Sequence, residues 1–415
     1  MARSRALVYT GPKNNGMGST APANKLRIGH RSLGERIFVS RRRIQLYNAF
    51  ERVASGLLLV TTLASVLAVL FIFIFIFKEA LPFFREEGFR EFFTSTKWYP
   101  SSAEPEFGAL ALLYGSAIVT LGATLFAAPL GLAVALFLSD VVSFNVRQVV
   151  KPIVEVLAAI PSVVYGFFAL VVFAPLMQNQ GGIFLAIGLT LILGPTGVIL
   201  SVISADLLAG AVPEKARTPV RLASLLVFLV TAGSITFLLA RAVSGITIVS
   251  GTNALNVAIV LGIMAIPTVV SVSEDSLTAV GRSLREASYS LGATRAETLF
   301  RVVLPAAKSG ITTAVILGVM RAAGETMVVW MASGNASRIP SPFYNLLEPV
   351  RTITATIAGD MGEADHITGS ARYSVLFALA LVLLLFVFIC NLASKWSTQK
   401  VAHRAKVRPA GNGRR

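Results

Sequence analysis

The sequence predicts an all-α, polytopic membrane protein, and two observations carry this prediction. Of the 415 residues, 54% are hydrophobic and only 14% are charged, whereas an average soluble domain has about 25% charged residues. The apolar residues also collect in long runs, most of them close to the roughly 20 residues that a helix needs to cross a bilayer. The mean hydropathy of +0.72 agrees, so a soluble fold is not expected.

Eight apolar runs predict eight membrane spans. In chain order, the runs cover residues 54–77, 110–138, 152–176, 183–203, 222–240, 257–272, 311–331 and 375–392. The second run is long and has Pro129 inside it, so we expect that span to kink or to tilt.

The composition divides the chain into four parts. They are a basic, largely disordered N-terminal segment (1–45), the first span with an external segment (46–106), the main membrane domain (107–394) and a basic C-terminal tail (395–415). The N-terminal segment is rich in Gly, Pro, Asn and Ser, which is typical of disorder. A cleaved signal peptide is not expected, because the first apolar run is too long for one.

The distribution of Lys and Arg predicts the orientation of the chain. Both terminal segments and a loop at 276–308 are basic, whereas the segment after the first span is acidic. Because cytoplasmic loops carry the excess of Lys and Arg, we expect both termini and this loop to face the cytoplasm. The net charge of +16 reflects this bias and contact with anionic membrane lipid. Nucleic-acid binding is not expected, since the basic residues flank spans.

The loop at 276–308 contains the most informative segment of the chain. It reads Glu286-Ala287-Ser288, three residues, Gly292, nine residues, Val302, one residue and Leu304-Pro305. Gly292 supplies a backbone break that residues with a Cβ atom resist. Thr294 and Glu297 have the spacing of a capping box, which starts a helix. The segment therefore predicts a helix–turn–helix on the cytoplasmic face, where a partner can dock.

This spacing resembles the EAA loop in the permease subunits of bacterial ABC importers. That loop reads Glu-Ala-Ala, three residues, Gly, nine residues, Ile, one residue and Leu-Pro, and Ser288 and Val302 depart from it mildly here. The resemblance implies a coupling loop that docks on an ATPase subunit. The residues it assigns to that loop are Glu286, Ala287, Ser288, Gly292, Leu304 and Pro305.

Further segments, above all 158–166 and 321–327, are similar to the PstC-type permeases of phosphate-specific ABC importers. The resemblance implies the fold of a type I ABC importer permease (MetI-like) in a bacterial inner membrane, and it implies phosphate transport. It also implies three partners: a homologous second permease (PstA-like), a cytoplasmic ATPase dimer (PstB-like) that uses ATP and Mg, and an external phosphate-binding protein (PstS-like). The chain itself would bind no cofactor.

The chain departs from that family between about residues 177 and 253. The family has a short connection there, whereas this chain has an insertion with the apolar runs 183–203 and 222–240. Two added spans preserve the orientation of everything that follows. A hydrophobic hairpin lying partly in the membrane interface is the alternative, and the lengths of the runs favour two spans.

Four polar residues are candidates for the translocation pathway. Arg321 and Glu325 are four residues apart, so we expect them to share one face of a helix. Two interpretations are open: an ion pair that only stabilises the bundle, or an arginine that meets a phosphate anion while Glu325 holds its guanidinium group. Ser162 and Tyr165 follow the helix-breaking Pro161, and they either line the pathway or pack.

Other functional classes have less support. There is no Gly-x4-Gly-Lys-Ser/Thr loop for ATP, no His–Glu metal motif and no nucleophile elbow, so we expect a non-catalytic membrane subunit. His366 lies near Asp360, Glu363 and Asp365, but no metal site is predicted from that alone. A permease for molybdate, sulfate or tungstate is the nearest alternative. A secondary transporter or a channel is a more distant one, because it would lack the docking loop.

Overall fold

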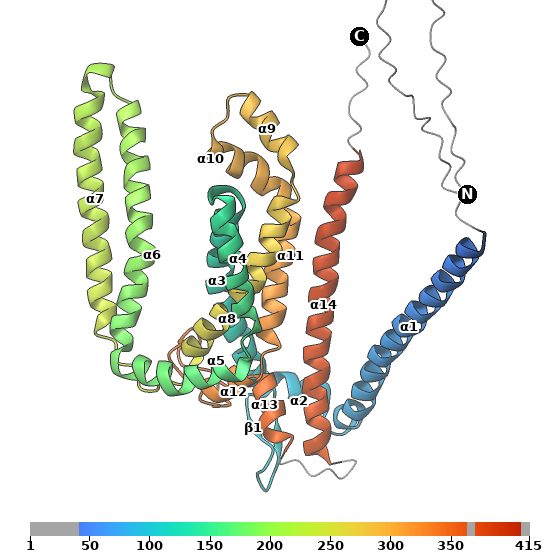
Figure 1. Ribbon diagram of the computed structural model, residues 1–415. Helices are drawn as coiled ribbons and strands as arrows, with labels where there is room; N and C mark the ends of the chain where they lie inside the picture. The colour runs from blue at the N-terminus through green and yellow to red at the C-terminus, as the bar shows by residue number, and fades with distance from the viewer. Residues whose placement is uncertain (1–40, 363–369, 408–415) are drawn as a thin grey trace, which may run out of the picture. The chain divides into compact units, whose positions relative to one another are not determined.

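The computed structural model describes residues 41–362 and 370–407. In these ranges the chain forms fourteen α-helices, three π-helical turns and one two-stranded antiparallel sheet, which confirms the all-α prediction (Figure 1). Residues 41–45, assigned above to a disordered segment, form the first turn of α1 (Arg41–Glu86). The rest of that segment lies outside the described residues, as do His366 and its neighbours Glu363 and Asp365.

The chain divides into two compact units, residues 1–67 and 68–415. In its described residues, the first unit is a single helix, the first part of α1, with exposed apolar side chains such as Leu57, Leu58 and Leu63. A helix that is hydrophobic all round is typical of a membrane span.

Three helices form the centre of the second unit: α3 (Leu110–Leu136), α8 (Ala254–Thr278) and α11 (Leu304–Ala323). A Cβ atom on Gly131 of α3 or on Gly318 of α11 would lie within 3 Å of the Val269 side chain of α8. Such small residues let helix backbones approach closely in a membrane, where no hydrophobic effect drives helices together. Helix α3 continues through Pro129 into the π-helical turn η1 (Phe137–Val141), and α14 (Ala371–Val407) packs on α11.

An aromatic cluster closes one end of this bundle. It involves the last turns of α1, α2 (Phe89–Thr94), β1 (Trp98–Tyr99), β2 (Glu106–Phe107), α13 (Ile353–Asp360) and the start of α14. The ring of Phe83 meets those of Phe92 and Phe107 edge to face, with centroids 5.4 and 5.6 Å away. Nε1 of Trp98 donates to Oδ2 of Asp360 at 3.2 Å. The segment that follows the first span is thus fixed to the segment that precedes the last one.

Two predicted spans are interrupted in the structure. The run 152–176 is divided among α4 (Phe144–Ala159), α5 (Ser162–Phe168), the π-helical turn η2 (Ala169–Phe173) and the start of α6 (Ala174–Gly210). The break falls at Pro161, whose ψ of 138° is extended and whose nitrogen cannot donate to the preceding turn. In the run 311–331, the helix ends at Ala323, and α12 (Met327–Ala332) starts after Gly324 and two further residues.

Seven helical segments of the described chain are long and apolar enough to cross a membrane. Residues 162–176 of the predicted run 152–176 and the whole run 183–203 lie in one of these segments, Ser162–Gly210. Within it, Gln180 has non-helical backbone angles, which mark a kink between the two runs. The count of eight spans therefore stays a prediction.

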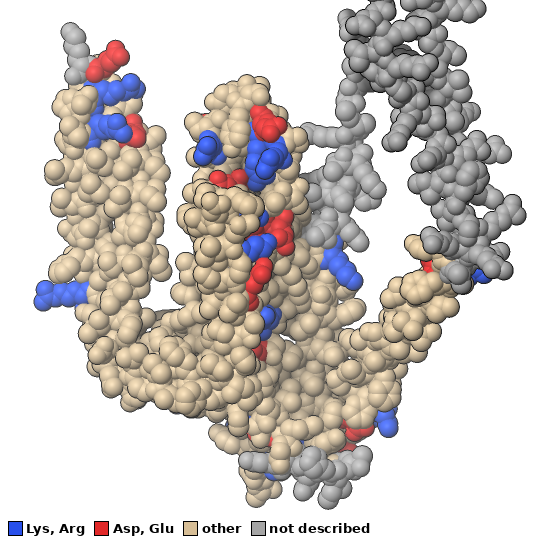
Figure 2. All heavy atoms as spheres, viewed as in Figure 1, with Lys and Arg blue, Asp and Glu red and all other residues tan. Residues whose placement is uncertain are grey.

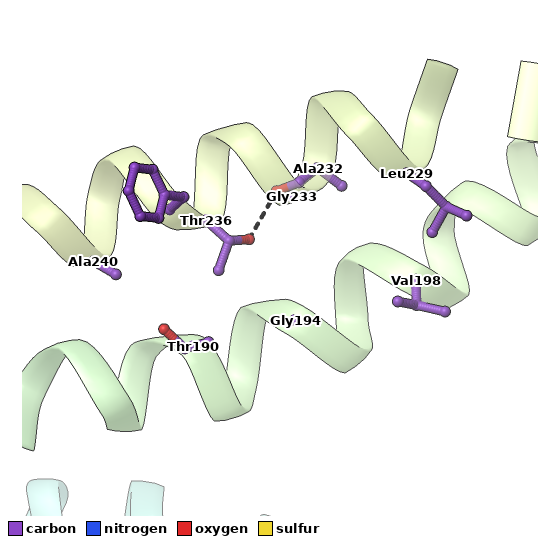
Figure 3. Close-up of a pocket in the computed structure, with 9 residues that line it drawn as sticks. Thr190, Gly194, Val198, Leu229, Ala232, Gly233, Thr236 and Ala240 are labelled. Carbon is purple, nitrogen blue, oxygen red and sulfur yellow. Dashed lines mark hydrogen bonds between the residues drawn. The ribbon is translucent and has the colours of Figure 1, made fainter. Parts of the chain in front are cut away.

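The inserted residues form a pair of helices, α6 and α7 (Glu214–Ser244), that lie side by side (Figure 1). An ion pair with 2.6 Å between Arg221 Nε and Asp206 Oδ1 joins them near the connecting turn. A cavity of about 340 Å³ lies between them and is lined by small and apolar residues (Figure 3). The hydroxyls of Thr190 and Thr236 donate to carbonyls of their own helices. The cavity therefore offers little to a polar ligand and suits a hydrocarbon chain.

Candidate functional site

The predicted coupling loop forms two short helices joined by a tight turn, here called the docking hairpin (residues 282–298). Helix α9 (Arg282–Ser290) is followed by Gly292, with φ +84°, and by α10 (Arg295–Thr298). Thr294 and Glu297 form the predicted capping box: the Thr294 N–H donates to Glu297 Oε2 at 3.0 Å, and the Glu297 N–H donates to Thr294 Oγ1 at 3.2 Å. The predicted helix–turn–helix is confirmed.

The residues of the EAA-like pattern take different positions in the structure. Ser288 is buried, and its Oγ lies 2.9 Å from Oγ1 of Thr298, which joins α9 to α10. Glu286, Ala287 and Pro305 are exposed, and Leu304 is half-buried. Ser288 therefore holds the hairpin together, while Glu286 and Ala287 are accessible to a partner.

One face of α9 is apolar and exposed. Leu284 is 47% exposed and Leu291 is 90% exposed, and Ala287 lies between them at helical spacing on the same face. Large apolar side chains that gather on an exposed face mark an interaction surface. This face is the part of the docking hairpin best suited to contact a partner.

An arginine that the sequence analysis missed fixes the docking hairpin to the bundle. Nε and one terminal nitrogen of Arg285 donate to the two carboxylate oxygens of Asp140, in η1, at 2.9 and 3.3 Å. The guanidinium group also donates to the carbonyls of Gly281 and Leu277, each at 3.0 Å. A bidentate pair of this kind gives both energy and a defined orientation. Arg285 thus positions α9 relative to the end of α3.

A buried carboxylate, also missed, ties α8 to α4. Glu274 is 1% exposed and forms ion pairs with Arg147 and with Lys151, whose Nζ lies 2.9 Å from Glu274 Oε2. The neighbouring Asp275 is 72% exposed and pairs with Lys151 at 3.4 Å. Helix α8 runs into the docking hairpin, and α4 runs to the break at Pro161. These three residues, Glu274, Arg147 and Lys151, are called the Glu274 cluster below. The cluster connects the docking hairpin to the break at Pro161 through α8 and α4.

The two helix breaks lie close together, as α5 packs on α12. A Cβ atom on Gly166 would lie 2.9 Å from the sulfur of Met331 and 3.2 Å from both the carbonyl oxygen of Met327 and Cα of Val328, so a larger residue there would require these neighbours to shift. The hydroxyl of Tyr165 donates to the carbonyl of Leu157 at 3.0 Å and bridges the break at Pro161. The segments 158–166 and 321–327, which contain the four candidate pathway residues, thus meet in the structure.

Arg321 is a half-buried cation at this meeting point. Its Nε is buried and makes no hydrogen bond with any described residue, and its guanidinium group pairs with no acid in the described part of the chain. Tyr165 lies close enough to Arg321 for the two side chains to interact electrostatically. Ser162, the first residue of α5, is half-buried beside the same break.

The expectation that Arg321 and Glu325 share a helical face is wrong. Helix α11 ends at Ala323, and Gly324 takes the C-cap position, so Glu325 lies beyond the helix. The carboxylate of Glu325 instead accepts from the Met327 N–H at 3.2 Å, at the start of α12, and the carbonyl of Glu325 accepts from the Thr354 hydroxyl at 2.7 Å. Glu325 therefore stabilises the break and leaves Arg321 without its expected partner.

Comparison with known proteins agrees with this geometry. Residues 127–403 match the family described as binding-protein-dependent transport system inner membrane component. The chain is 31% identical over 374 residues to the probable ABC transporter permease protein YqgH of Bacillus subtilis, covering 89% of this chain and 96% of YqgH. It is 32% identical over 313 residues to the phosphate transport system permease protein PstC of Mesorhizobium japonicum, covering 75% of this chain and 79% of that protein. For the PstC protein of Xylella fastidiosa strain 9a5c, the identity is 32% over 301 residues, covering 72% and 77%. The chain belongs to the family of binding-protein-dependent transport system inner membrane components.

Proposed function

We propose that this chain is the permease subunit of an ATP-driven phosphate importer and that it lines the translocation pathway. The observation that carries this proposal is Arg321, a half-buried cation with no acidic partner among the described residues. An ionisable side chain inside a membrane-spanning bundle is costly, and it typically marks the path of a solute. A planar guanidinium group can donate to two oxygens of one phosphate, which suits Arg321 to that anion.

Two of the relatives favour phosphate over other anions, because both are named phosphate transport permeases. Arg321 would also attract molybdate, sulfate or tungstate, so a permease for one of these oxyanions is the alternative. A secondary transporter or a channel has no need of the docking hairpin, and the exposed apolar face of α9 argues against that class.

The proposed complex has four kinds of component. The chain would pair with a homologous second permease, an ATPase dimer that uses ATP and Mg, and an external phosphate-binding protein, with lipid around the spans. The chain itself would be non-catalytic and bind no cofactor. Both termini and the docking hairpin would face the cytoplasm of a bacterial cell, with the loop at 245–253 outside.

The contacts of the docking hairpin suggest how ATPase movement would reach the pathway. A pull on α9 would act through Arg285 on the end of α3 and directly along the chain on α8. From α8, the Glu274 cluster would pass the movement to α4 and hence to the break at Pro161. Discontinuous membrane helices often form the substrate sites of transporters, so a shift of this break would reach the pathway.

Copurification tests this proposal. The tagged full-length chain, extracted from its own membranes, is expected to bring down an ATPase, a second permease and a binding protein that carries phosphate, as identified by mass spectrometry. If the binding protein carries sulfate, molybdate or tungstate instead, that anion and not phosphate is the transported solute. Recovery without any ATPase would overturn the importer proposal.

Replacing Gly292 with alanine should lower uptake several-fold while ATP hydrolysis continues. The φ of +84° at Gly292 costs an L-residue on the order of 1–2 kcal/mol, so the turn of the docking hairpin would shift. Gly292→Asn should keep more activity, because asparagine tolerates this conformation better than alanine. Gly210→Ala is the control, as that helical position has open space. Equal uptake by Gly292→Ala and Gly210→Ala would contradict the expectation.

The orientation of α6 and α7 can be measured by cysteine labelling in a Cys390→Ala background. Glu214 and Val249 are both exposed; Glu214 is the first residue of α7, and Val249 lies in the loop that follows the last one, Ser244. In spheroplasts, a membrane-impermeant maleimide should label Val249→Cys, and it should label Glu214→Cys only after the membrane is opened. Labelling of both sites before opening, or of Glu214→Cys alone, would contradict the proposed topology.

A further inference from the structure

A hollow of about 760 Å³ lies behind the docking hairpin, where α9 and α10 approach the ends of α3 and α8. Four arginines line it: Arg147, Arg282, Arg285 and Arg295. In the described part of the chain, Asp140 is the one acidic residue that lines it. Figure 2 shows Lys and Arg side chains, with Asp and Glu side chains among them, at this end of the bundle. The hollow is called the arginine pocket below.

The charges of the arginine pocket are not balanced within the chain. Arg285 is paired with Asp140, and Arg147 is paired with the buried Glu274. Arg282 and Arg295 are exposed, and neither forms an ion pair with any residue in 41–362 or 370–407. Two uncompensated positive charges therefore face a hollow in which two further guanidinium groups are already fixed, an arrangement that attracts anions.

A further polar group in the arginine pocket is also without a partner. The hydroxyl of Ser139, in η1, is buried and makes no hydrogen bond with any described residue. A buried hydroxyl without a partner is unfavourable unless a ligand or water completes it. The Ser139 oxygen is itself shielded from solvent, so the groups that a phosphate in the hollow would meet are the forked guanidinium groups, which match its oxygens.

The arginine pocket and the apolar face of α9 lie on opposite sides of that helix. Arg282, Arg285 and Tyr289 follow one another at spacings of three and four residues and line the pocket. Leu284, Ala287 and Leu291 follow the same spacing on the other side. A partner protein seated on the apolar face would leave the pocket uncovered, which favours a small anionic group over an acidic protein side chain as its occupant.

We propose that the arginine pocket binds a phosphate group, supplied either by free inorganic phosphate or by the headgroup of an anionic phospholipid. This site is separate from Arg321. It goes beyond the proposed function, because a phosphate group would bind there whichever anion the complex transports. A bound phosphate group would bridge Arg282, at the start of α9, and Arg295, at the start of α10. It would thereby stiffen the docking hairpin against the end of α3.

The test uses the full-length chain with its copurifying subunits in nanodiscs without ATP. In neutral phosphatidylcholine, binding of radiolabelled inorganic phosphate is measured by equilibrium dialysis. In a second arm, phosphatidylglycerol is added, and the amount retained after detergent exchange is measured by mass spectrometry. The variant Arg282→Gln with Arg295→Gln should keep the fold, since both side chains are exposed and unpaired.

The control is Arg301→Gln with Lys308→Gln, which removes the same charge from exposed positions outside the pocket. Loss of two charge-assisted contacts should weaken binding by about tenfold or more. The pocket variant is Arg282→Gln with Arg295→Gln. If it binds less inorganic phosphate than the control variant does, the ligand is free phosphate. If it instead retains less phosphatidylglycerol than the control variant does, the ligand is the lipid headgroup. Equal behaviour of the two variants in both arms would overturn the proposal. Loss of only the ATPase from the pocket variant would also overturn it, and would assign the pocket to an acidic protein side chain.

Discussion

Replacing Arg321 with alanine should reduce phosphate uptake by on the order of 100-fold, because a hydrogen bond to a charged group contributes about 1.5–3 kcal/mol and each 1.4 kcal/mol is about tenfold. Arg321 is half-buried beside two helix breaks and has no acid partner among the described residues, so an anion in the pathway would be its natural counterion. Arg321→Lys should give an intermediate loss, since an ammonium group keeps the charge without the planar fork.

The measurement for Arg321 is uptake of radiolabelled phosphate into vesicles, followed beside ATP hydrolysis and copurification of the partners. Arg338→Ala is the matched control, because it removes an exposed arginine that pairs with Glu348 and that lies outside α11 and α12. Exchange of Arg321 and Glu325 is not expected to be tolerated, since the two do not pair and Glu325 serves the start of α12. Full uptake by Arg321→Ala with all partners bound would make Arg321 a structural residue.

Replacing Glu274 with alanine should both destabilise the chain and uncouple transport. Glu274 is 1% exposed and compensates Arg147 and Lys151, whose side chains are 29% and 33% exposed. Because water can reach these two cations once the carboxylate is gone, the loss should be about 1.5–3 kcal/mol, below the cost of leaving a fully buried charge unpaired. The tie between α8 and α4 would be lost with it. We therefore expect a lower melting temperature and, in the protein that remains folded, ATP hydrolysis with little uptake.

Asp275→Ala provides the matched control for Glu274. Asp275 is the next residue along the chain, but it is 72% exposed and makes only a long contact with Lys151, so its replacement should change stability and uptake little. Glu274→Asp, which keeps the charge, should retain more coupling than Glu274→Ala. Uptake and hydrolysis that fall in parallel in Glu274→Ala would show loss of folding alone and would contradict a role in coupling.

Features that depend on local spacing were predictable from the sequence. The turn at Gly292 and the capping box of Thr294 and Glu297 follow from a few consecutive residues, and the structure confirms both. The apolar runs likewise predicted the positions of the long helices. A helix that crosses a membrane needs about 20 mainly apolar residues, and such a run is visible in the sequence.

Features that depend on distant residues were not predictable in this way. Arg285 and Asp140 are 145 positions apart. No local sequence pattern predicts that ion pair, and none predicts the contacts of Glu274 with α4. The interruption after Ala323 was hidden for another reason: the polar segment Gly324–Thr326 is only three residues long and lies between the mainly apolar stretches 311–320 and 327–331, so the run looked long enough for one span. Spacing of four residues predicted a shared face for Arg321 and Glu325, and it failed because the helix stops between them.

The most direct test of the central claim is ATP-dependent solute uptake by the purified complex in proteoliposomes. With the external binding protein supplied, the complex should accumulate radiolabelled phosphate only when ATP and Mg are present. A large excess of sulfate, molybdate or tungstate should leave that accumulation nearly unchanged. Accumulation that needs no ATP, or that one of these other anions suppresses as effectively as unlabelled phosphate, would contradict the account.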